Sequence, residues 1–234
     1  MSVSTVEVHG PGSSTQGAKP AQIYLQPIAA PSILGLFGFG GATFIVAAHM
    51  AHWYGGANTD LYLAAFAATF GGLAQFMAGM WAFRARDAVA TAMHGMWGAF
   101  WIAYGILQYQ FVSGELHRPT GAFPALGYWF IVLAAITWMG SWAASAENKV
   151  VASVLLFLAG GSTLAAIGEL AGSEGLRVIA GYLFIISAIL AWYAASAMML
   201  EGAFHRTVLR SGKAIGHEAA LVSGVGEPGV IRRQ

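Results

Sequence analysis

Cysteine is absent from the 234-residue chain, which excludes disulfides, zinc–cysteine sites, iron–sulfur clusters and thiol nucleophiles. Charge is scarce as well, because Asp, Glu, Lys and Arg make up only 9% of the residues, against roughly 25% in an ordinary soluble domain. The ten acidic and eleven basic side chains nearly cancel, so nothing favours a nucleic-acid partner. The 31 glycines have no three-residue period, which excludes collagen.

Apolar residues dominate what remains. They form 57% of the chain, and the mean hydropathy of +0.64 indicates that a lipid bilayer is the main solvent. A transmembrane helix needs about 20 mostly apolar residues. Six blocks meet that length: Ile33–Tyr54, Leu61–Phe83, Val89–Val112, Phe123–Ala146, Val150–Ala171 and Leu176–Leu200. The sequence therefore predicts an all-α membrane protein with six transmembrane helices.

The remaining residues leave no room for a separate catalytic domain. We expect a flexible N-terminal tail over residues 1–26, a six-helix transmembrane domain over 27–211 and a flexible tail over 212–234. The first 26 residues lack the apolar core of a signal peptide. We therefore predict a protein that is not an enzyme and holds no cofactor or metal.

The distribution of Lys and Arg predicts the orientation in the membrane. With six spans, both ends of the chain lie on one side, together with the second-to-third and fourth-to-fifth connections. That side carries nine of the eleven Lys and Arg residues, and the other side carries only Arg118 and Arg177. The positive-inside rule therefore places both termini in the cytoplasm.

Several helices carry faces of unusual composition. The predicted second and fifth helices align small residues at spacings of three and four, which is typical of close helix packing or of a pore wall. The third helix instead aligns five groups with polar atoms, and these should avoid lipid because unpaired polar groups are costly in hydrocarbon. This face comprises His94, Trp97, Trp101, Tyr104 and Gln108.

Polar groups inside spans are the strongest functional signal in a membrane chain. His49, Gln75 and His94 stand out here, and Tyr104 shares the face of His94. Gln75 is equally consistent with a bridge between two helices. No Lys, Arg or Asp lies in the middle of a span, so we expect any anion to be held weakly.

Five motifs in series resemble those of the acetate uptake transporters, also called succinate–acetate permeases. Residues Gly35–Gly40 read Gly-Leu-Phe-Gly-Phe-Gly, and Gly71–Gly79 read Gly-Gly-Leu-Ala-Gln-Phe-Met-Ala-Gly. The third is Trp97–Trp101, similar to the family's Tyr-Gly-x-Phe-Trp. The fourth and fifth are Leu164–Gly168 and Arg206–Leu209.

The resemblance implies six helices per subunit, a pore within each subunit and subunits packed in a ring, most often a hexamer. It implies transport of acetate and related small carboxylates, including succinate, by a channel or a proton symport mechanism in the inner or plasma membrane. Carried over by motif position, the pore gate falls on Phe39, Trp97 and Leu158. The polar groups along the path are then His49, Gln75, His94 and Tyr104.

Three departures from the family pattern affect this path. Trp97 replaces the gate Tyr of the family, and an indole is bulkier than a phenol and lacks its hydroxyl. His94 replaces a Phe one turn earlier, and Ala47 replaces an Asn two residues before His49. The substrate could therefore differ from that of the family.

Three alternatives remain open at the level of sequence. A urea or short-amide channel has a similar six-helix architecture and favours an aromatic pore without fixed charge. His49 and His94 could hold a haem in a redox protein. The chain could also be a signalling or structural membrane protein whose gate does not conduct.

Overall fold

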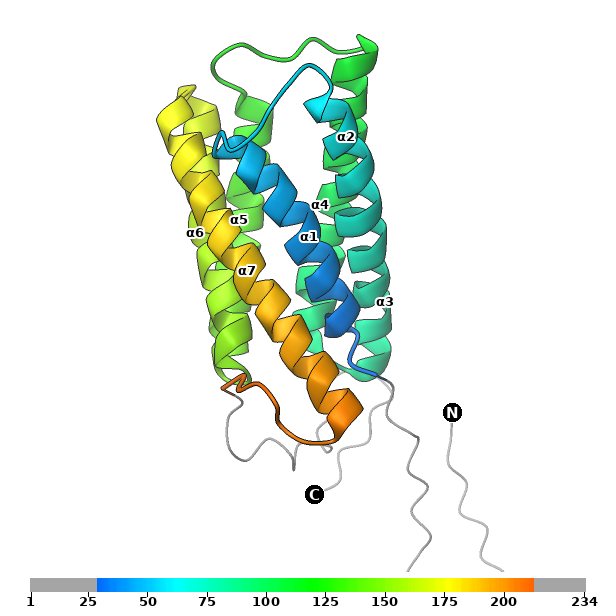
Figure 1. Cartoon of the computed structure of the whole chain (residues 1–234). Helices are drawn as coiled ribbons and strands as arrows, with labels where there is room; N and C mark the ends of the chain where they lie inside the picture. Colours follow the sequence, from blue (N-terminus) through cyan, green and yellow to red (C-terminus); the bar gives the residue numbers. More distant parts are fainter. Residues whose placement is uncertain (1–28, 213–234) are drawn as a thin grey trace, which may run out of the picture.

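A computed structural model describes residues 29–212, and the two predicted tails lie almost entirely outside these residues. Eight helical segments form a bundle of six long rods (Figure 1). They are α1 (Ser32–Met50), α2 (Thr59–Phe66), η1 (Ala67–Ala74), α3 (Gln75–Ala85), α4 (Ala88–Ser113), α5 (Pro124–Ser145), α6 (Lys149–Ala171) and α7 (Glu174–Phe204). The segments α2, η1 and α3 follow one another without a break and make a single rod. The prediction of an all-α fold is confirmed.

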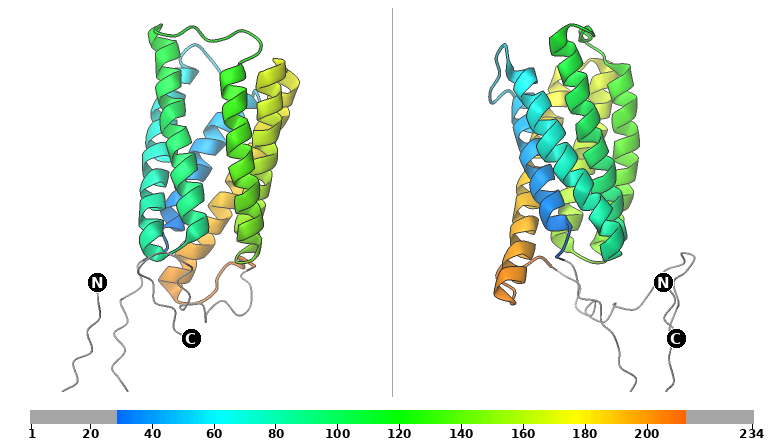
Figure 2. Two further views of the ribbon diagram at one scale, coloured as in Figure 1. Left: turned by 180° about the vertical axis from the view of Figure 1, so that it is seen from behind. Right: turned by 90° about the vertical axis from the view of Figure 1, so that its right-hand side faces the viewer.

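The rods pack in sequence around a closed ring. Helix α1 packs against α7 on one side and against the α2–η1–α3 rod on the other, which in turn packs on α4; α5 joins α4 to α6, and α6 returns to α7. The start of helix α1 and the end of helix α7 lie at the same end of the bundle (Figures 1 and 2). The connections 51–58 and 114–123 lie at the opposite end (Figure 1). This end contains the opening of the site described below.

Within residues 29–212, five of the rods are long and apolar enough to cross a membrane, and α4 is the sixth long rod. Helix α4 has 26 residues, but its Trp, Tyr, His, Gln and Gly residues lower its hydropathy. Those polar groups are turned inward: His94, Trp97, Trp101 and Gln108 are all buried. The outer surface of the bundle is apolar, and Trp142 on α5 is 75% exposed. A bilayer is the solvent that suits this surface.

Local sequence accounts for the helix ends. The carboxylate of Asp87 accepts a hydrogen bond from the Ala90 amide at 2.8 Å and caps α4. The side chain of Asn148 accepts from the Val150 and Val151 amides and caps α6. Helix α6 ends at Ala171, and the next residue, Gly172, has a left-handed φ of +64° that suits a glycine. These capping residues define helix boundaries that hydropathy alone does not locate.

The π-helix η1 was not predicted, because the second span was expected to be a regular helix. At Gly71, within η1, an added Cβ would lie 2.8 Å from Cγ of Trp101 on α4. At Gly98 on α4, an added Cβ would lie 2.6 Å from the backbone nitrogen of Phe76. The second span and α4 therefore approach at backbone distance, as small residues permit in membrane proteins. π-Helical turns are rare and occur often near functional sites.

Candidate functional site: a cavity closed by an aromatic gate

The bundle encloses a cavity of about 360 Å³ that opens at the end of the connections 51–58 and 114–123. At its inner end the cavity meets Trp97, Leu158 and Phe184, all of them buried. At its mouth lie charged and imidazole side chains from the connections and helix ends, some exposed and some largely buried. We define the mouth by His49, His52, Asp60, Arg118, Glu169, Glu174 and Arg177.

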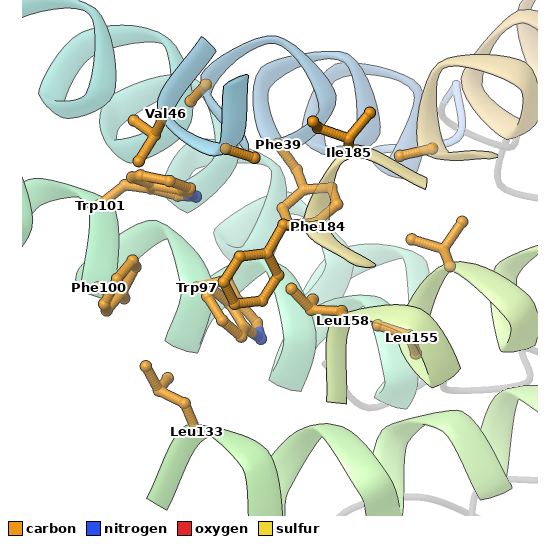
Figure 3. Packing of buried hydrophobic residues seen from close by; sticks show 14 of the residues in the cluster. Phe39, Val46, Trp97, Phe100, Trp101, Leu133, Leu155, Leu158, Phe184 and Ile185 are labelled. Atoms are coloured by element: carbon orange, nitrogen blue, oxygen red, sulfur yellow. The ribbon is translucent and has the colours of Figure 1, made fainter. Parts of the chain in front are cut away.

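The three predicted gate residues belong to one hydrophobic cluster inside the ring (Figure 3). Phe39 and Trp97 meet edge to face, with ring centroids 6.3 Å apart and an interplanar angle of 70°. Trp97 and Leu158 line the cavity, whereas Phe39 does not. All three side chains are 2% exposed. Apolar atoms of Trp97 on α4 and Leu158 on α6 therefore lie at the inner end of the cavity, and Phe39 on α1 packs against Trp97 outside the lining.

A hydrogen-bond relay fixes the orientation of Trp97. Its indole Nε1 donates to Oγ1 of Thr137 at 3.0 Å. The hydroxyl of Thr137 donates in turn to the carbonyl of Leu133 at 2.6 Å. Thr137 is completely buried in α5. Since a buried indole N–H needs an acceptor, the relay selects one orientation of the Trp97 ring.

Sequence reasoning missed two residues at this end of the cavity. Thr137 is one, because its role depends on facing Trp97 across the bundle. Phe184 on α7 is the other, and it stacks on Phe130 with ring centroids 6.3 Å apart. Figure 3 labels Phe184 among the buried hydrophobic residues, together with Trp97 and Leu158. A Phe in an apolar helix carries no signal that separates a gate from ordinary packing.

Two of the four predicted path residues line the cavity, namely His49 and Tyr104. Tyr104 stacks on Phe100 with centroids 5.9 Å apart and meets Trp101 edge to face. Gln75 and His94 are buried outside the cavity lining. A role for these two in the path stays a prediction.

His49 lies beside a loop carbonyl and a carboxylate. Its Nδ1 is 3.1 Å from the Tyr54 carbonyl, and since a carbonyl only accepts, Nδ1 carries the proton. Its Nε2 is 4.0 Å from Oδ1 of Asp60. The Tyr54 hydroxyl donates to the Ile45 carbonyl at 2.6 Å, and burial raises the pKa of Tyr54. The phenol therefore stays neutral near pH 7 and supports the wall beside His49.

His94 lies one helical turn from Trp97 towards the other end of α4. Its Nε2 is 3.3 Å from the Ser32 hydroxyl, and its Nδ1 has no hydrogen-bond partner in the described part of the chain. An added Cβ at Gly35 would lie 2.5 Å from the imidazole ring. The first glycine of the Gly35–Gly40 motif thus makes room for His94.

Ion pairs connect the helix ends around the mouth. Arg118 contacts Asp60 at 3.0 Å, and Arg177 contacts Glu169 at 3.1 Å and Glu174 at 3.2 Å. His52 contacts Glu174 at 2.8 Å. The sequence analysis used Arg118 and Arg177 only to predict the orientation in the membrane. Asp60 is distant from Arg118 along the chain, whereas Glu174 is one helical turn from Arg177. Within residues 29–212, no group of three or more His, Asp and Glu side chains is placed to hold a metal ion.

These features define a multi-pass α-helical membrane protein with a cavity that has a polar mouth and a buried apolar inner end. The sequence model of the GPR1/FUN34/yaaH family matches residues 12–211. The chain belongs to this family.

Named relatives agree with the family assignment. The chain is 26% identical over 186 residues to the succinate-acetate/proton symporter SatP of Escherichia coli strain K12, an alignment that covers 80% of this chain and 96% of that protein. It is 25% identical over 189 residues to ammonia transport outward protein 2 of Saccharomyces cerevisiae strain S288c, covering 80% of this chain and 66% of the yeast protein.

A solved structure supports the fold. The structure of the bacterial acetate channel SatP superimposes with a TM-score of 0.72 at 25% sequence identity. The match covers 79% of this chain and 99% of that chain. The resemblance read from the five sequence motifs is confirmed.

Proposed function

We propose that this protein transports acetate and related small carboxylates, including succinate, across the membrane through the cavity of each subunit. The carrying observation is the cavity of about 360 Å³ whose inner end is closed by Trp97 and Leu158. Kinship with a protein named as a succinate-acetate/proton symporter supports the choice of substrate.

The gate chemistry favours movement of the carboxylate together with a proton. A bare carboxylate loses its hydration shell in a dry constriction, and burying an unpaired charge is costly. Acetic acid, or acetate with its proton, avoids most of that cost. The methyl group suits contact with the rings of Phe39 and Trp97, which meet edge to face. Small size and partial neutralisation are therefore the selection rules of the gate.

The wall above the gate supplies neutral polar contacts. Tyr104 lines the cavity and presents a phenol, and His49 lines it nearer the mouth. These groups donate to or accept from a carboxyl group without trapping it as a fixed cation would. Weak, successive contacts are what conduction requires.

We further propose the assembly and orientation that follow from the sequence. By resemblance to the family, six subunits form a ring, with a separate path in each subunit. Both termini face the cytoplasm across the inner or plasma membrane, since nine of the eleven basic residues lie on that side. Residues 27–211 form the transport domain, and the chain catalyses no reaction.

Uptake by proteoliposomes tests the function. Labelled acetate, urea and ammonium are offered separately, with and without an inward proton gradient, and protein-free liposomes give the background. We expect saturable acetate uptake that the gradient increases. Urea uptake without acetate uptake would favour a urea or short-amide channel, and ammonium uptake alone would favour the activity named for the yeast relative.

A further inference from the structure

The two arginines of the mouth differ in how much of each guanidinium is occupied. Each nitrogen of Arg177 lies against a protein oxygen: Nη1 contacts Glu174, Nη2 donates to the Gly121 carbonyl, and Nε is 3.1 Å from Glu169 in an ion pair without hydrogen-bond geometry. Arg177 is largely buried, with a side chain 19% exposed. It therefore ties α6, α7 and the connection 114–123 together, and each of its three nitrogens already lies against an oxygen of the protein.

Arg118 is held in a different way. Its contacts with Asp60 and Gln108 both run through Nη2, which leaves Nη1 and its two N–H donors available. The guanidinium carbon lies 5.2 Å from the centre of the Phe111 ring, within the range of a cation–π contact. The side chain is 47% exposed and lines the mouth of the cavity. Arg118 is thus fixed in place while part of its donor set faces the opening.

We propose that Arg118 is the recognition residue that receives the carboxylate of the substrate at the mouth, before the substrate reaches the gate. A guanidinium donates to a carboxylate in a charge-assisted hydrogen bond, which is stronger than a neutral one. Asp60 holds Nη2 and partly neutralises the cation, so the anion binds without being trapped. This inference rests on the proposed function, since it assigns the first contact of the same path.

The position of Arg118 also explains why one cation is tolerated on a route that must release its ligand. At 47% exposure the site is screened by water, so the contact is weaker than a buried one. Arg118 lines the same cavity as His49 and Tyr104, so a small carboxylate bound at Nη1 has further polar contacts available along the wall. Net selectivity for anions over neutral solutes then arises at the mouth, and selection by size arises at Trp97.

The test is a kinetic comparison of Arg118→Gln with wild-type protein in proteoliposomes. We expect the KM for acetate to rise about tenfold, equivalent to about 1.4 kcal/mol, with an unchanged maximal rate. Flux of acetamide, a neutral solute of similar shape, should not change. The matched control is Arg84→Gln, which removes an exposed arginine outside the cavity lining and should leave the acetate KM unchanged.

A second variant separates direct contact from the local electric field. Arg118→Gln combined with Asp60→Asn removes one positive and one negative charge, so the net charge of the mouth is kept. Direct recognition predicts that the acetate KM stays raised in the double variant. Recovery of the wild-type KM, or an equal loss of acetate and acetamide flux in the single variant, would overturn the proposal. If wild-type protein takes up no acetate, the proposed function itself fails, whereas an unchanged KM in Arg118→Gln refutes only this assignment.

Discussion

Replacing Thr137 by Val removes the acceptor that orients the gate indole. Trp97 Nε1 donates to the Thr137 hydroxyl at 3.0 Å, and both side chains are buried. Val has nearly the same shape but leaves the indole N–H without a partner, which costs roughly 1–3 kcal/mol for a buried group. That penalty raises the population of other Trp97 orientations by a factor of roughly 5 to 150. We therefore expect a looser gate without a change in its composition.

The assay is uptake of acetate and of lactate by the same proteoliposomes. Lactate is larger, so its uptake should depend more strongly on the orientation of Trp97, and Thr137→Val should raise the lactate-to-acetate ratio several-fold. Trp97→Phe provides the matched background, because a phenyl ring has no N–H to satisfy. Adding Thr137→Val to Trp97→Phe should change the ratio no further. A similar rise in both backgrounds, or no rise in either, would refute the role of the hydrogen bond.

Three further outcomes are expected. Trp97→Ala should let lactate and succinate compete better with acetate in vesicle uptake, although partial collapse of neighbouring side chains limits the gain; an unchanged rate and ratio would make Trp97 a packing residue only. His49→Ala should lower acetate uptake with assembly intact, and wild-type uptake from pH 5 to 8 would contradict a role in receiving the carboxylate or its proton. Gly98→Ala should destabilise the protein by about 1–3 kcal/mol in thermal unfolding, since its Cβ would lie 2.6 Å from the Phe76 nitrogen, whereas Gly95→Ala meets nothing within 4 Å and is the control.

Hydropathy predicted the rods well because a bilayer imposes a length on apolar segments. The fifth block was expected at Val150–Ala171, and α6 spans Lys149–Ala171. The first block was expected to reach Tyr54, but α1 ends at Met50. The chain turns there, and His52 adopts a φ of +60°. Apolar side chains beyond a helix end look the same to a hydropathy scale as those inside it.

The burial of one face of α4 was also predictable, because polar atoms at helical spacing cannot all face lipid. The π-helix η1 was not predictable, since its surroundings are tertiary: Gly71 lies against Trp101 on another rod. The mouth was missed for a related reason. Arg118 and Asp60 are far apart in sequence and meet only after the bundle forms.

The proposed gate was predicted only in part from the sequence. Its three residues came from the family resemblance, and no spacing within the chain pairs Phe39 with Trp97. The contact between these rings, at 6.3 Å, is consistent with that assignment. The anchor at Thr137 needed coordinates, because a Thr in an apolar helix usually bonds to its own backbone. Thr137 does so with Leu133 and accepts from Trp97 as well.

The absence of cysteine makes a direct test of the path possible, because a single introduced thiol is the only one in the chain. Tyr104→Cys places it in the cavity wall, and Ser113→Cys places it on the exposed end of α4 outside the cavity lining. A charged methanethiosulfonate reagent added from the mouth side should label both, block acetate uptake only in Tyr104→Cys, and react there more slowly when acetate is present. Labelling of Tyr104→Cys that leaves acetate uptake unchanged would contradict a path through the cavity of the subunit.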